Sequence, residues 1–229
     1  MLAVILVHFN NVWNAPVNIL NKASAIGARC PQLFFIISAY LTWNALGKKS
    51  VGYIEFLKKR YKRMAPLYYV SLVTAVLIPA FKVFDIGIGN YISHIVFLNG
   101  LNPSWCYGIM GVEWYIADLA LLYLMVPCLR KLITNLKTAI IAFLASVVLS
   151  SGALVIVNSV FSVQMAENNA YEAYFHTGFI VYQIPVLIVG IVLYYLIKKL
   201  QMEEFQGILQ LASLGWLQWQ RQSGLLFCT

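Results

Sequence analysis

Charged side chains are scarce in this sequence of 229 residues, at 10% of the total, whereas 61% of the residues are hydrophobic. A soluble domain of this size carries about 25% charged residues to cover its surface. The mean hydropathy is +0.77, and the apolar residues form long blocks instead of alternating with polar ones. Lipid can solvate such a surface and water cannot. The composition therefore excludes a soluble domain and predicts an all-α bundle of transmembrane helices, each about 20 residues long.

The sequence also lacks the patterns typical of a metal or redox site and of a cleavable signal peptide. The four cysteines have no spacing typical of a metal or redox site, so we predict no metal site. No basic leader precedes the first apolar run, as it would in a cleavable signal. The formal net charge of +8 could indicate nucleic acid in a soluble protein. Here the basic residues cluster at the ends of apolar segments, as in cytoplasmic loops, so we predict the lipid bilayer as a partner and no nucleic acid.

Six apolar segments are predicted to span the bilayer. They cover residues 1–13, 31–46, 65–84, 112–129, 138–161 and 178–197. The first is too short to cross alone at a rise of about 1.5 Å per residue, so we expect the natural protein to have residues before Met1. Two basic stretches, 48–63 and 130–137, are predicted to be cytoplasmic by their charge.

A further segment, residues 86–101, is short and contains Asn90, His94 and Asn99. If it spanned fully, the basic stretch 130–137 would lie outside, against the charge pattern. We therefore predict an interfacial or re-entrant helix on the outer side, where its polar groups can meet water or protein. With this helix, both ends of the chain are predicted to be cytoplasmic.

The composition of the sequence changes near residue 200, where the long apolar segments end. Residues 1–200 are predicted to form an incomplete membrane domain, and residues 201–229 an atypical tail. The tail has no clear span, several Gln, and Trp216 and Trp219 near its end. An interfacial helix and an abnormal terminus, such as read-through after a frameshift, are both open interpretations.

His8 lies inside the first apolar segment, beside Asn10 and Asn11. An ionisable residue within a membrane is energetically costly, which makes it a functional candidate. Imidazole is well suited to take a proton from a hydroxyl near neutral pH. The alternative is a neutral histidine that only forms a hydrogen bond to a neighbouring helix.

Arg60 and Arg63 stand three residues apart, and Pro66 follows after three more. If the third helix begins here, both guanidiniums share one face at the cytoplasmic interface. Two such groups could bind phosphates bidentately, as a nucleotide-containing substrate requires. Without further observations, ordinary anchoring at the membrane interface is the favoured interpretation.

Glu113, Trp114 and Asp118 lie at the outer end of the fifth segment. Two carboxylates about one turn apart could orient a polar acceptor. They could equally satisfy Arg29 or the positive end of the helix. His94 and His176 lie in outward-facing stretches and are predicted to be solvated.

Together these segments resemble the acyltransferase family 3 membrane proteins, which O-acylate bacterial surface sugars. The matching stretches are LAVILVHF around His8, LFFIISAYL at 33–41, RYKRMAP at 60–66, WYIADLALLYLMVP at 114–127 and TGFIVYQIPVLIVGIVL at 177–193. The family's second helix typically reads FF-x-x-S-G-[FY]-L, and Ala39 replaces its Gly here. The family's R-x-x-R-x-x-P is present in full. The resemblance extends from residue 1 to about residue 199, in the family's order.

The resemblance implies a multi-pass protein of the bacterial inner membrane that transfers an acyl group from cytoplasmic acyl-CoA to a carbohydrate hydroxyl on the far side. Acetyl-CoA is the expected donor, and no permanently bound cofactor is implied. His8 becomes the candidate general base, and Arg60 and Arg63 become candidates for binding the CoA phosphates. Glu113, Trp114 and Asp118 then belong to the acceptor side.

Two departures from the family pattern affect this expectation. Family members carry an Arg about ten residues before this His, a position that falls before Met1 here. They also continue for roughly four more spans after the point where the resemblance of this chain stops. We therefore expect a truncated chain, with an inactive fragment as one outcome. Two alternatives remain: a transporter or flippase for a polysaccharide precursor, which would have internal repeats with broken helices that we do not find, and a non-catalytic remnant.

Overall fold

The computed structural model describes residues 27, 30–48, 52–78, 87–103, 105–106, 109, 113–167 and 169–224. These residues form helices and their connections, with no strand among them, which confirms the all-α prediction. His8 and the first predicted span lie outside the described residues.

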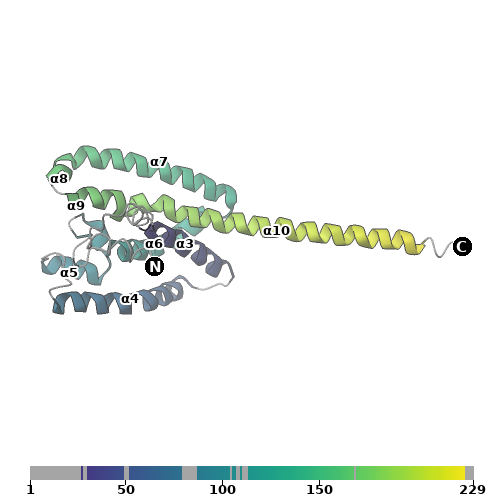
Figure 1. The fold of residues 1–229 in the computed structure, drawn as a ribbon, viewed down its shortest axis with the longest axis horizontal. Helices are drawn as coiled ribbons and strands as arrows, with labels where there is room; N and C mark the ends of the chain where they lie inside the picture. Colours follow the sequence, from purple (N-terminus) through teal and green to yellow (C-terminus); the bar gives the residue numbers. More distant parts are fainter. Residues whose placement is uncertain are drawn as a thin grey trace, which may run out of the picture.

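Among the described residues, five long helices build the bundle. They are α3 (Cys30–Lys48), α4 (Tyr53–Leu77), α6 (Trp114–Leu132), α7 (Leu136–Val160) and α10 (Ile180–Gly224). The shorter elements are α5 (Ile88–Ile95), the 3₁₀-helix η2 (Asn99–Leu101), α8 (Ser162–Glu167), α9 (Asn169–Ala173) and the π-helix η3 (Tyr174–Gly178). The long helices run alongside one another, and α10 continues well beyond the others (Figure 1).

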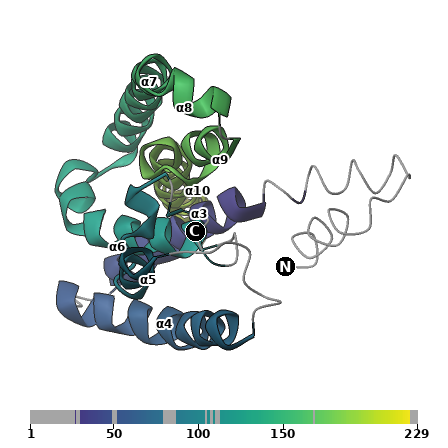
Figure 2. The same cartoon turned by 90° about the vertical axis from the view of Figure 1, so that its left-hand side faces the viewer.

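The centre of the bundle is formed where α10 packs against α3 and α7. Seen along the long axis, α7 and α4 lie on opposite sides, with α3 and α10 between them (Figure 2). Helix α6 contacts both α4 and α10. The most deeply buried apolar side chains include Phe35, Leu122 and Ile191, one from each of α3, α6 and α10. The three helices therefore share one core.

The two ends of this bundle differ in chemistry. At one end α3 and α6 finish and α4 and α7 begin, and this basic end carries Lys48, Arg130, Lys131 and Lys137. At the other end lie α5, η2, η3 and the first turns of α6, which we call the polar end. The short helices α5, α8 and α9 gather at this end in Figure 1.

Within the part of the chain that the structure describes, two helices are long and apolar enough to cross a membrane by length and composition, over Leu136–Val160 and Tyr174–Glu204. They coincide with the predicted spans 138–161 and 178–197. Large aliphatic side chains cover their outer faces, and Val148 and Leu149 are 70% and 69% exposed. Such surfaces suit lipid, so the protein is a helical membrane bundle. No other helix among the described residues meets both criteria, so the other spans stay predictions.

Helix α4 begins at Tyr53, twelve residues before the predicted start of the third span at residue 65. The basic stretch predicted as a loop is therefore largely helical. Phe56 is 5% exposed and packs into the core, while Lys58 and Lys59 point to the surface. Hydropathy registers only the charges of this stretch, whereas its helical periodicity places them on one face.

The other boundaries differ from the predictions mainly at the last helix. The predicted span ends at residue 197, but α10 continues to Gly224, so most of the atypical tail belongs to that helix. Helix α5 has eight residues, which cover about 12 Å at 1.5 Å per residue. It is too short to cross about 30 Å of hydrocarbon, as expected for a partial helix.

Candidate functional site

The polar end of the bundle buries polar side chains from three elements. They are Asn90, Ser93 and His94 of α5, Asn99 of η2, Glu113 immediately before α6, and Asp118 of α6, none more than 6% exposed. Burying so many polar groups is costly unless they are paired or functional. This cluster is therefore the candidate functional site.

His94 is fully buried, so the prediction that it is solvated is wrong. Its Nδ1 lies 2.9 Å from the carbonyl oxygen of Asn90. A carbonyl only accepts, so Nδ1 carries the proton and Nε2 of the neutral ring is left as an acceptor. Burial lowers the pKa of His94, against the opposing effects of the Asn90 hydrogen bond and the Glu113 carboxylate. His94 is therefore neutral near pH 7.

The turn after α5 places η2 beside α6. Phe97 has a φ of 60°, in the left-handed region where glycine usually ends a helix. The N–H of Leu98 donates to the carbonyl of Ser93 (2.8 Å) and that of Phe97 to the carbonyl of His94 (3.2 Å), the two bonds of a Schellman motif. The Phe97 ring stacks on Tyr68 of α4, with centroids 5.0 Å apart. This aromatic packing offsets the cost of the strained backbone and fixes the direction of the chain toward η2.

Gly100 of η2 packs tightly against the first turns of α6. A Cβ added at Gly100 would lie 3.1 Å from Cβ of Ala117 and 3.2 Å from Oδ1 of Asp118. The hydroxyl of Tyr174 in η3 donates to the Gly100 carbonyl at 2.8 Å. Two contacts thus hold η2 against the first turns of α6 and against η3.

Four of the buried side chains have polar atoms without a hydrogen-bond partner in the described part of the chain. These atoms are Oδ1 of Asn90, Nε2 of His94, both amide atoms of Asn99 and both carboxylate oxygens of Asp118. Of these residues, we call His94, Asn99 and Asp118 the unpaired set. A buried polar atom without a partner costs about 1–3 kcal/mol, and native proteins contain few of them. Their gathering at one place indicates a site that binds a polar group.

Glu113 adjoins the unpaired set. It is 1% exposed, and its Oε1 accepts a hydrogen bond of 2.9 Å from the backbone N–H of Ile109. Trp114 follows it and packs toward α3, with its ring centroid 6.3 Å from that of Phe35. The structure therefore brings Glu113 and Asp118 to one end of the bundle, and it places the Trp114 ring among aromatic core residues.

Cys106 lies near the same carboxyl groups. It is fully buried, and burial raises the pKa of its thiol, with Asp118 and Glu113 adding to the effect. A thiol that stays protonated is a poor nucleophile, so Cys106 does not fit the role of an acyl carrier. Within the described residues, no group of His, Cys, Asp and Glu is placed to hold a metal ion.

Arg60 and Arg63 lie within α4 and not at its start, and their surroundings differ. Arg60 is half-buried, donates to Oγ1 of Thr42 at 3.2 Å, and places its guanidinium carbon 5.3 Å from the ring centroid of Tyr123. Arg63 is exposed. Arg60 therefore connects α4 to α3 and α6, whereas Arg63 is available at the surface.

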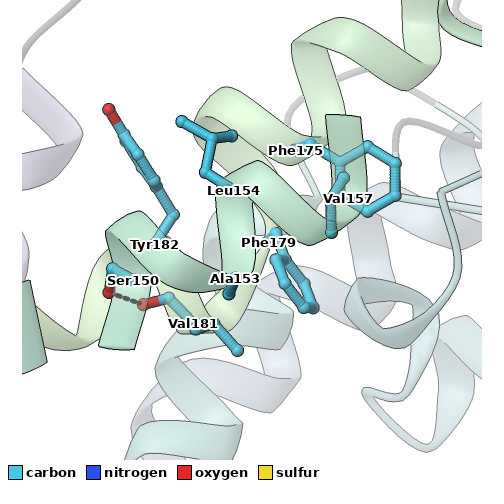
Figure 3. Close-up of a pocket in the computed structure, with 8 residues that line it drawn as sticks. All are labelled: Ser150, Ala153, Leu154, Val157, Phe175, Phe179, Val181 and Tyr182. Atoms are coloured by element: carbon cyan, nitrogen blue, oxygen red, sulfur yellow. Dashed lines mark hydrogen bonds between the residues drawn. The ribbon is translucent and has the colours of Figure 1, made fainter. Parts of the chain in front are cut away.

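Two cavities are unsuited to a polar substrate. Figure 3 shows the gap between α7 and α10, which has a volume of about 10 Å³ beside the hydrogen bond from Ser150 Oγ to the Val181 carbonyl (2.6 Å). That is at the lower limit for one water molecule. A groove of about 370 Å³ lies between α4 and α5. Its lining is Tyr69, Leu72, Val73, Val76, Leu77, Tyr91 and Ile95, which offers almost no polar surface for a sugar.

The sequence predicts Glu113 and Asp118 as site residues but gives no such role to His94 and Asn99, which are fully buried beside them. The available signal was the presence of several polar residues within the short apolar segment 86–101. This segment is predicted to be interfacial and its histidine to be solvated. In the structure both side chains are fully buried, where η2 contacts α5 and α6. The placement of His8 relative to this site lies outside the described residues.

Comparison with known proteins bears on the chemistry of this site. The model of a family described as an acyltransferase domain, acyltransferase family 3, matches residues 1–218. A similar curated protein is the exopolysaccharide production protein ExoZ of Rhizobium meliloti (strain 1021), which is 27% identical over 82 residues. This match covers 34% of the chain described here and 26% of ExoZ. No solved structure matches the chain.

Proposed function

Because this chain belongs to the acyltransferase domain family, we propose that it takes part in O-acyl transfer from acyl-CoA, with acetyl-CoA as donor, to a hydroxyl of a cell-surface carbohydrate. The similar protein ExoZ is named for exopolysaccharide production, which supports a carbohydrate acceptor. The chain spans about a quarter of the length of that protein, so the proposal concerns the complete protein in its membrane.

The unpaired set is the observation that carries this proposal. A sugar hydroxyl both donates and accepts hydrogen bonds, and His94 Nε2, the Asn99 amide and the Asp118 carboxylate together offer both functions. Residues 87–103 and 113–120 contain no Lys or Arg. A site with two carboxyl groups and no cation in these stretches suits an uncharged sugar better than an anionic one.

The reaction joins the hydroxyl oxygen to the thioester carbonyl carbon. The new C–O bond forms as the C–S bond breaks, CoA leaves as the thiolate, and the hydroxyl proton passes to a base. We assign His8 as this base, since imidazole can accept a proton near neutral pH. Arg63, exposed on α4, is the candidate of the arginine pair for the CoA phosphates.

The proposed orientation follows from the charges. Lys48, Arg130, Lys131 and Lys137 gather at the basic end, and basic residues concentrate on the cytoplasmic side of membrane proteins. The donor would then enter from the cytoplasm at the basic end of a bacterial inner-membrane protein. The acceptor would approach the polar end from outside.

The test uses membranes that contain the complete protein, labelled acetyl-CoA and an uncharged surface polysaccharide. We expect alkali-labile label on the polysaccharide, and its loss in His8→Ala and in Asp118→Asn. His176→Gln is the matched control, because His176 lies in η3 at the same end but outside the unpaired set. No transfer by the wild-type protein would overturn the proposal. Transfer that survives His8→Ala would remove only the assignment of the base.

A further inference from the structure

A pocket of about 190 Å³ opens at the basic end, far from the unpaired set. Three helices form it: the last turn of α3, the first turns of α4 and the last turns of α6. Its lining residues are Leu46, Tyr53, Phe56, Val126, Pro127 and Arg130. The pocket thus combines aromatic and aliphatic walls with one cationic side chain.

The aromatic walls are held in place by the surrounding helices. Phe56 is 5% exposed and packs edge-on against Tyr123 of α6, with centroids 5.7 Å apart and planes at 89°. The hydroxyl of Tyr53 donates to the Leu124 carbonyl at 3.2 Å. Two flat rings are therefore fixed before any ligand binds, which lowers the entropic cost of binding.

Arg130 retains most of its hydrogen-bonding capacity. Its Nη1 donates to the carbonyl oxygen of Leu46 at 3.1 Å, and a guanidinium has five N–H donors in a planar fork. The side chain is exposed. The fork is thus oriented by α3 while several N–H groups remain available to an anion.

The charge around the pocket favours an anionic ligand. Lys131 follows Arg130 in the last turn of α6, at the same end. Glu55, the acidic residue in the first turn of α4, forms an ion pair with Lys59 at 2.6 Å. The hydrogen bond from Lys59 and its positive charge lower the pKa of Glu55. The carboxylate of Glu55 is thus already paired and does not cancel the charge of Arg130.

We propose that this pocket binds the phosphorylated ADP portion of the acyl-CoA donor, with the adenine on the Tyr53 and Phe56 walls and a phosphate on Arg130. The inference rests on the proposed function and adds Arg130 as a donor-binding residue, in a pocket whose Phe56 ring centroid lies 5.4 Å from the guanidinium carbon of Arg60. A flat, apolar base matches the aromatic walls, and a guanidinium fork matches a phosphate bidentately. Arg130 is then a binding residue that discriminates donors by their nucleotide.

A purely structural role for Arg130 makes a different prediction. Basic side chains near a helix C-terminus commonly satisfy its last carbonyls, and the bond to Leu46 is of this kind. In that case a substitution would change stability and affect all donors equally. A comparison of a donor that contains the nucleotide with one that lacks it therefore distinguishes the structural role of Arg130 from the binding role.

The experiment compares acetyl-CoA with S-acetylpantetheine, which lacks the nucleotide, as donors for the complete protein. For Arg130→Gln we expect KM for acetyl-CoA to rise about tenfold or more, because a charged hydrogen bond is lost, and KM for S-acetylpantetheine to stay unchanged. Arg130→Lys should recover part of the loss. Lys198→Gln is the matched control, since Lys198 is an exposed cation of α10 and does not line the pocket.

Equal effects of Arg130→Gln on both donors, or no effect on either, would overturn the inference. If the wild-type protein transfers from neither donor, the proposed function fails. A separate binding measurement then tests whether the pocket binds the nucleotide portion of CoA. The probes are then CoA and pantetheine added to the purified protein. Tighter binding of CoA that is lost in Arg130→Gln supports the pocket, and equal binding of the two probes by the wild-type protein rejects it.

Discussion

Gly190 of α10 lies directly against the backbone of α3 at Ile36 and Ala39, where the two helices pack together. A Cβ added at Gly190 would overlap the Ile36 carbonyl oxygen and lie 2.8 Å from Cβ of Ala39. Small residues allow helix backbones in membranes to approach closely, which strengthens their packing. The family pattern has a Gly at position 39. Ala39 is accommodated because the residue facing it has no side chain.

This contact predicts that Gly190→Ala destabilises the protein. The added methyl meets backbone that cannot move aside, and overpacking of this kind costs about 1–3 kcal/mol. The measurement is thermal unfolding in detergent. Gly152→Ala is the matched control, because Gly152 lies in α7 with nothing within 4 Å of an added Cβ. That variant should be neutral or more stable by up to about 1 kcal/mol. Equal changes in unfolding temperature for the two substitutions would contradict the close packing of α10 on α3 at Gly190.

Asp118→Asn is expected to separate activity from stability. The substitution removes a buried carboxylate whose oxygens have no partner among the described residues, so the unfolding free energy should rise by about 1 kcal/mol, while acyl transfer is lost. Unfolding and transfer are measured on the same preparation. Glu167→Gln, at an exposed position of α8, should change neither. A marked loss of stability in Asp118→Asn would show that the carboxylate serves the fold.

His94 should make the protein sensitive to mild acid. Burial lowers its pKa below the ordinary value of 6.5, so the unfolded chain takes up a proton at a higher pH than the folded protein does. The folded state is therefore expected to lose stability as the pH falls below about 6.5. His94→Gln should reduce the difference in unfolding temperature between pH 7.5 and pH 5.5, and His176→Gln should not. If His94→Gln leaves that difference in unfolding temperature unchanged, the conclusion that His94 is buried in its neutral form is wrong.

Arg60 and Arg63 are expected to respond differently to substitution. Arg60 binds Thr42 and stacks near Phe56 and Tyr123, so Arg60→Ala should lower the unfolding free energy by about 1–2 kcal/mol. Arg63→Ala should stay within about 0.5 kcal/mol of the wild type, as surface substitutions usually do. Chemical denaturation in detergent measures both. A larger loss of stability for Arg63→Ala would contradict the arrangement described here.

The sequence by itself determined the class of the protein and several of its elements. The apolar blocks of α7 and the first part of α10 were predictable, because membrane crossing depends on local composition and length. Glu113 and Asp118 could be assigned to one site for a similar reason. They lie five residues apart around the start of one helix, so their proximity needs no information from other helices.

The tertiary structure alone decided which polar groups share that site and which arginine faces the interior. His94 and Asn99 are fully buried where η2 contacts α5 and α6, and hydropathy cannot register such contacts between separate elements. Arg60 and Arg63 have the same chemistry, and only the positions of Thr42 and Tyr123 on two other helices distinguish them. The pocket at Arg130 likewise needs three helix ends to meet. Burial depends on which surfaces pack together. In lipid, packing and hydrogen bonds between helices determine which surfaces these are.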